Sequence, residues 1–138
     1  MIVLDASALT DWLLRIEGRG AAVGEQMRAA RVLHTLDFAA LEVVSALRRK
    51  TARRELSTRR AQQALGDLAA TPLRRHRAAP LAARVWELRA SHTAYDAAYV
   101  ALAESLSAPL ITTDRPLALS RGHSARIVEP GPSERGTP

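Results

Sequence analysis

Two aspartates stand where predicted strands end. Asp5 closes the apolar run that begins at residue 2, and Asp114 follows the β-prone run 110–112. The carboxyl ends of parallel strands gather at one edge of an α/β sheet, which is where such folds place their chemistry. Burying a carboxylate there is unfavourable unless another group pairs with it. Asp5 and Asp114 are therefore candidates for a shared acidic site, and the alternative is that each only caps a helix or a turn.

Two further acids lie near the starts of predicted helices. Glu42 interrupts the apolar segment FAALEVVSALRRK, whose buried stripe we expect to consist of Leu41, Val44 and Leu47. Small residues at 45 and 46 would let Glu42 reach the sheet edge. The alternatives are that Glu42 only favours the helix dipole, pairs with Arg49 or faces water.

Asp96 lies in the segment TAYDAAYVALAESL, three residues after Thr93. This spacing is close to a capping box, so Asp96 is explained equally well as part of a helix cap and as part of a site.

Two hydroxyls accompany the acids. Ser7 can hydrogen-bond Asp5 or a bound water, or cap the following helix, and Thr112 faces the same way as Asp114 because strand side chains alternate.

Converging carboxylates need a neutralising partner. Two of them ~4 Å apart repel by about 4 kcal/mol at an effective dielectric constant of about 20. The chain has no cysteine, and its four histidines lack the spacing of a metal site. Oxygen ligands alone favour Mg²⁺ or Mn²⁺, and such ions suit phosphodiester cleavage because they polarise the phosphate and activate water.

The order of strands and helices predicts the fold. Candidate strands at 2–5, 32–35, 110–112 and 125–129, and a weaker one at 73–77 that is polar enough to be an edge, alternate with helical patterns. This alternation is typical of a three-layer α/β/α sandwich with a mostly parallel central sheet. We expect one domain over residues 1–129 and a disordered tail over 130–138. Without a membrane span or a leader segment, the expected location is the cytoplasm.

In order and spacing, four segments resemble the PIN-domain family, and in particular the VapC-type ribonuclease toxins of bacterial toxin-antitoxin systems. These segments are IVLDASAL, LEVVSALRR, TAYDAAYVALAESL and PLITTD. The resemblance implies an endoribonuclease that hydrolyses RNA phosphodiesters by in-line attack of an activated water. It also implies Mg²⁺ or Mn²⁺ as cofactor, a homodimer, and a cognate VapB-like antitoxin as partner.

The same resemblance assigns roles to individual residues. It makes Asp5, Glu42, Asp96 and Asp114 the catalytic and metal-binding acids, and Ser7 and Thr112 the accessory hydroxyls. Some PIN domains carry a further acid two or three positions after the last one. Pro116 and Leu117 occupy those positions here, so the fifth acid is absent.

The net charge of +6 is consistent with a polyanionic partner. The basic run 48–60, RRKTARRELSTRR, can contact RNA phosphates, contact an antitoxin or simply face solvent. The candidate RNA-binding residues are Arg48, Arg49, Lys50, Arg53, Arg54 and Arg115.

Three other functions compete with nuclease activity. An inactive PIN fold that serves as a binding scaffold is disfavoured because all four acids are present. A receiver-like signalling domain requires a lysine after a late strand, whereas the only lysine is Lys50. A phosphatase of the haloacid dehalogenase type needs an aspartate two residues after the first, where Ser7 stands.

Overall fold

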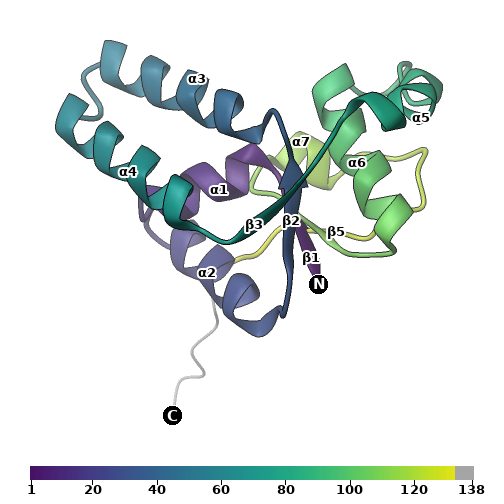
Figure 1. Ribbon diagram of the computed structural model, residues 1–138, viewed down its shortest axis with the longest axis horizontal. Helices are drawn as coiled ribbons and strands as arrows, with labels where there is room; N and C mark the ends of the chain where they lie inside the picture. Colours follow the sequence, from purple (N-terminus) through teal and green to yellow (C-terminus); the bar gives the residue numbers. More distant parts are fainter. Residues whose placement is uncertain (133–138) are drawn as a thin grey trace.

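The fold is built on a five-stranded parallel sheet, shown in a computed structural model that describes residues 1–132 (Figure 1). The strand order is β3-β2-β1-β4-β5, and each neighbouring pair is parallel. The predicted α/β/α sandwich is therefore confirmed, with the first strand at the centre and the polar β3 at an edge. The elements in chain order are β1 (Ile2–Leu4), α1 (Ala6–Leu13), α2 (Arg19–Ala29), β2 (Leu33–Leu36), α3 (Ala39–Ala52), α4 (Thr58–Ala70), β3 (Leu73–His76), the 3-10 turn η1 (Ala79–Leu81), α5 (Ala82–Glu87), α6 (Ala94–Leu106), β4 (Leu110–Ile111), α7 (Arg115–Ala118) and β5 (Ile127–Val128).

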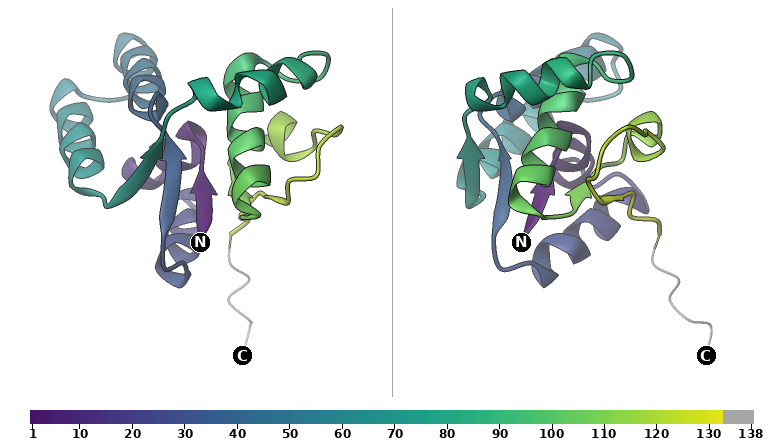
Figure 2. Two further views of the ribbon diagram at one scale, coloured as in Figure 1. Left: turned by 45° about the vertical axis from the view of Figure 1, so that its right-hand side comes forward. Right: turned by 90° about the vertical axis from the view of Figure 1, so that its right-hand side faces the viewer.

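The helices form two groups on either side of the sheet (Figure 2). Helices α1 to α4 pack on one another, and α3 and α4 extend from the sheet as a hairpin (Figure 1). On the other side α6 lies against β1, β2 and β4, and α5 packs on α6. Because α6 is covered by the sheet and by α5, its residues 97–103 are all buried. This burial fixes Asp96, one residue earlier, beside the sheet edge.

The predicted buried stripe of α3 is partly wrong. Leu47 is buried, but Leu41 is 71% exposed and Val44 is 42% exposed. The buried positions of this helix are instead Ala39, Val43 and Leu47, spaced four residues apart. The helix is thus rotated toward the Glu42 side, which half-buries Glu42 and leaves two aliphatic side chains in solvent.

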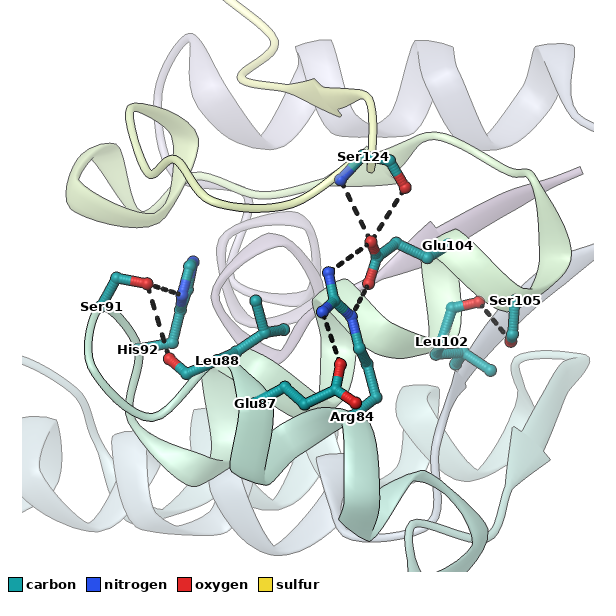
Figure 3. A network of polar contacts seen from close by, with 9 residues as sticks. All are labelled: Arg84, Glu87, Leu88, Ser91, His92, Leu102, Glu104, Ser105 and Ser124. Atoms are coloured by element: carbon teal, nitrogen blue, oxygen red, sulfur yellow. Dashed lines mark hydrogen bonds and ion pairs between the residues drawn. The ribbon is translucent and has the colours of Figure 1, made fainter.

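Glu104 is a structural ion-pair partner rather than the solvated acid that its helix position suggests. Its Oε1 and Oε2 accept from Arg84 Nε and Nη2 at 2.9 and 3.0 Å, and Oε2 also accepts from the backbone N–H and hydroxyl of Ser124 at 3.1 and 2.9 Å. Arg84 also donates through Nη1 to Oε2 of Glu87, which lies on the same helix, at 2.8 Å (Figure 3). The network joins α5, α6 and the loop before β5.

The expected tail lies mostly outside the described residues, since only Pro130, Gly131 and Pro132 of it fall within residues 1–132. Among the described residues, no helix is long and apolar enough to cross a membrane.

Candidate active site

A cavity of about 300 Å³ at the carboxyl edge of the sheet is lined by all four predicted acids. Asp5 follows β1 directly, and Asp114 immediately precedes α7. Glu42 lies in the first turn of α3, and Asp96 lies in the first turn of α6. Residues up to 109 positions apart in the sequence therefore meet in one hollow because four different elements end or begin there.

The carboxylate of Asp5 is buried, at 4% exposure, and hydrogen bonds compensate for its burial. Its Oδ1 accepts from Ser7 Oγ at 2.7 Å and from the Ala8 N–H at 2.9 Å, and its Oδ2 accepts from Thr112 Oγ1 at 2.5 Å. The hydroxyls of Ser7 and Thr112 also lie 3.1 Å apart and each accepts a backbone N–H after β4. Asp5 is thus a helix cap and a wall of the cavity at once, so its two alternative roles coexist.

Glu42 is oriented by a buried tyrosine that was not among the predicted site residues. Tyr99 is 1% exposed, and its hydroxyl donates to Glu42 Oε1 at 2.7 Å. Phe38, which precedes α3, packs edge-on against Tyr99 with ring centroids 5.5 Å apart. The predicted pairing of Glu42 with Arg49 does not occur, because Arg49 donates to Ser45 Oγ instead. The sequence did contain a signal for this role, because Tyr99 follows Asp96 by three residues and so lies on the same face of the helix.

The two remaining acids sit at helix starts whose caps are satisfied. Asp114 Oδ1 accepts from the Leu117 N–H at 3.2 Å, so Asp114 caps α7. At α6 the cap is Thr93, whose hydroxyl accepts from the Asp96 N–H at 3.2 Å. Capping therefore occupies one carboxylate oxygen of Asp114 and only the backbone of Asp96, which leaves the Asp96 side chain facing the cavity.

The charges of the four acids act on one another, with Asp96 at the centre. Burial, followed by the negative charge of Asp96, raises the pKa of Glu42, although the Tyr99 hydroxyl opposes the shift. Burial and then the charge of Asp114 raise the pKa of Asp96. Burial raises the pKa of Asp5 to about 6 against its three hydrogen bonds, and the charge of Asp96 adds to the rise. The cavity therefore concentrates negative charge, since none of the four acids forms an ion pair with another described residue.

The donor chemistry of this cavity fits a hard divalent cation. Carboxylate oxygens are the ligands that such ions prefer, and a cation would relieve the repulsion that raises these pKa values. Within residues 1–132, no three His, Cys, Asp or Glu side chains are close enough to share one ion as they stand. Glu42 Oε2 and Asp114 Oδ2 make no hydrogen bond to the described residues, so both can turn toward a ligand.

The predicted basic residues divide into two groups. Arg49 and Lys50 line the same cavity as the acids. The remaining members do not line it and are exposed, namely Arg48, Arg53, Arg54 and Arg115. Arg115 Nη1 pairs instead with Glu129 at 3.2 Å, so it balances a neighbouring acid at the end of β5.

A larger hollow of about 800 Å³ lies between α1, α2 and α4, and its lining includes Trp12, Met27 and Leu33. None of the four candidate acids reaches it. Size alone would favour this hollow. The smaller cavity, however, holds one buried and three half-buried carboxylates whose charges raise one another's pKa values, a feature common at sites of chemistry.

Comparison with known proteins shows the family of this chain. A family model described as PIN domain matches residues 2–119. This chain belongs to the PIN-domain family. The resemblance seen in the sequence is thereby confirmed.

This PIN domain is similar to several named ribonucleases. It is 41% identical to Ribonuclease VapC12 of Mycobacterium tuberculosis over 127 residues, which cover 92% of this chain and 97% of that protein. It is 40% identical to Ribonuclease VapC9 of the same species over 114 residues, covering 83% and 86%. Ribonuclease VapC3 of Pyrobaculum aerophilum is 38% identical over 121 residues, covering 85% and 92%.

The fold likeness extends to a solved structure. The crystal structure of Mycobacterium tuberculosis VapC20, described as a sarcin-ricin loop cleaving toxin, superposes on this PIN domain with a TM-score of 0.65 at 18% identity. The match covers 86% of this chain and 93% of that chain. At this identity the likeness shows the PIN fold.

Proposed function

We propose that this PIN domain is an endoribonuclease toxin that uses Mg²⁺ or Mn²⁺. The observation that carries the proposal is the single cavity lined by Asp5, Glu42, Asp96 and Asp114. Burial and mutual repulsion raise the pKa values of three of these acids. The similarity to several proteins named VapC ribonucleases supports RNA as the substrate.

In the proposed mechanism the four acids hold the divalent cation. When bound, the cation would polarise the scissile phosphate and lower the pKa of the attacking water. The protein fixes the ligand set: Ser7 and Thr112 orient both oxygens of Asp5, and Tyr99 orients Glu42. The buried position of Asp5 and the packing of Tyr99 limit the freedom of these groups, so less ordering remains to be done when substrate binds.

The chelation test separates this proposal from an inactive scaffold. Purified protein should cut a 5′-labelled RNA in Mg²⁺ and lose all cutting in excess EDTA, because the carboxylates alone cannot polarise a phosphate. Adding Mn²⁺ or Mg²⁺ back should restore cutting, as followed by denaturing gel electrophoresis. Cutting that persists in EDTA would contradict the metal mechanism, and soluble folded protein that never cuts RNA would favour the scaffold.

The proposed partner is a VapB-like antitoxin, and the proposed place of action is the cytoplasm. Expressed alone in bacteria, the chain should arrest growth because it destroys RNA that the cell needs. Co-expression of the small open reading frame upstream should relieve the arrest. Colony counts after induction measure both effects, and harmless expression of folded protein would contradict the toxin proposal.

The proposed assembly is a homodimer through an exposed apolar face on α3, α5 and α6. Its exposed members are Leu41, Trp86 and Tyr95, with exposures of 71%, 66% and 58%. Phe38 joins them, since its ring lies 5.1 Å from that of Tyr95 and lines a shallow cavity with Trp86. Exposed apolar groups gathered in this way mark an interface more often than a free surface.

The double variant Leu41→Ser, Trp86→Ser should therefore convert a dimer into a monomer because it removes the apolar centre of that face. Analytical ultracentrifugation measures the mass. Leu119→Ser is the matched control, since Leu119 is 64% exposed and lies directly after α7. A double variant that sediments as wild type does would overturn this assignment of the dimer surface.

A further inference from the structure

The acidic cavity has a second, cationic end. Besides the four acids, its lining includes Thr10 and Asp11 of α1 and Arg49 and Lys50 of α3. Lys50 follows Glu42 by eight residues, about 12 Å along the helix axis. Helical side chains lean toward the helix N-terminus, so Arg49 and Lys50 extend back toward the carboxylates.

These two cations line a carboxylate-rich cavity without pairing with its acids. Within the described part of the chain, neither Arg49 nor Lys50 forms an ion pair, and Arg49 Nη1 donates only to Ser45 Oγ at 3.0 Å. Asp11, the acid at this end, is paired with Arg19 Nε at 2.9 Å. Their positive charge is therefore available to an anion from outside the chain.

Thr10 supplies an independent sign of a ligand at this end. Its residue exposure is 4%, and its Oγ1 is buried without a hydrogen bond to any of the described residues. A buried hydroxyl without a partner destabilises the folded state, so native proteins keep few of them. Because Thr10 also lines this cavity, a polar group bound there, or the neighbouring side chains as they move to bind it, can supply the partner that the hydroxyl lacks.

We infer that Arg49, Lys50 and Thr10 form a binding site for the RNA phosphate next to the scissile one. This inference rests on the proposed ribonuclease function. The carboxylate end takes the scissile phosphate together with the cation, and the cationic end takes its neighbour on the strand. Holding two successive phosphates would fix the direction and register of the RNA and orient the scissile bond for in-line attack.

The test measures binding without cleavage. The Asp96→Asn variant is titrated into a fluorescent single-stranded RNA in which one phosphate at a time is replaced by a neutral methylphosphonate. Neutralising the neighbouring phosphate should weaken binding about tenfold, as the loss of a charge-assisted contact does. Adding Lys50→Met should abolish the sensitivity to that position and reduce the slope of log affinity against log salt by about 0.7. Lys50→Arg should keep the sensitivity.

Arg31→Gln is the matched control because it removes the same charge from an exposed residue before β2, at the opposite edge of the sheet. It should leave the methylphosphonate profile unchanged. Thr10→Val should weaken RNA binding severalfold while raising the temperature of thermal unfolding, because it removes the unpaired hydroxyl. A purely structural threonine would move the unfolding temperature and leave RNA binding unaltered.

The outcomes separate two failures. If the Lys50→Met profile keeps the same sensitive phosphate, the phosphate site is overturned while the ribonuclease proposal stands. If the Asp96→Asn variant binds no RNA and the wild-type chain cuts none, the ribonuclease proposal fails and the phosphate site fails with it.

Discussion

Asp96→Asn should reduce RNA cleavage by at least about a hundredfold, a loss typical of removing an electrostatic group from a catalytic centre. Asp96 is the acid whose charge acts on Asp5 and Glu42, while Asp114 acts on Asp96. Asparagine keeps the shape and the Thr93 cap, which uses only the Asp96 backbone N–H. It removes the charge that a divalent cation needs. Initial rates of cleavage of a labelled RNA measure the effect.

The control for this substitution is Asp67→Asn, which removes an equal charge from an exposed residue of α4 outside the acidic cavity. It should cut RNA at the wild-type rate. Circular dichroism should show native helix content in both variants. An Asp96→Asn variant that is folded and fully active would refute the metal-carboxylate mechanism.

Glu104→Gln should lower the thermal unfolding temperature by several degrees, since one or two kcal/mol shifts the unfolding temperature of a domain this size by that much. Glu104 accepts hydrogen bonds from Arg84 and from the backbone and side chain of Ser124. Glutamine loses the charge and one acceptor oxygen, which weakens the link between α5, α6 and the loop before β5. Glu87→Gln is the matched control, because Glu87 holds the same arginine with a side chain that is 63% exposed. Calorimetry should show a much smaller change for it, and equal shifts would contradict this role of Glu104.

Acidification should reveal the same network. The hydrogen bonds from Arg84 lower the pKa of Glu104 to about 2, below its value in the unfolded chain. A depressed pKa in the folded state adds stability that is complete above the unfolded pKa, about 4.3, and is lost as the pH falls from there toward 2. The stability difference between wild type and Glu104→Gln should therefore shrink across that window. A constant difference in calorimetry would contradict the assigned ion pair.

The sequence predicted the sheet well, and it singled out four acids that line one cavity, because strand ends and helix starts depend on local patterns. Apolar runs that end in Asp5 and Asp114 mark strand ends, and the segment around Asp96 carries a helix start in its own residues. These signals do not depend on what packs against them. The role of the acids as metal ligands remains a prediction, since their placement in one cavity does not by itself show an ion bound there.

The contacts that the sequence did not predict are those set by tertiary packing. The rotation of α3 depends on its neighbours, so Val43 is buried where Leu41 was expected. Glu104 finds Arg84 on another helix, a pairing that helical spacing along α6 does not encode. Trp86 belongs to a residue type that is mostly buried, but it is 66% exposed because α5 has no element over that face among residues 1–132.

The central position of β1 determines when the acidic cavity can form. Leu4 of β1 pairs with Ile111 of β4, 107 positions later, and Asp114 follows β4 in the sequence. Such distant pairings close late, because a long loop must be ordered before they form. The acidic cavity therefore cannot be complete before β4 and the residues after it have been made and paired. The topology thus makes the last corner of the cavity wait for a strand pairing that spans most of the domain.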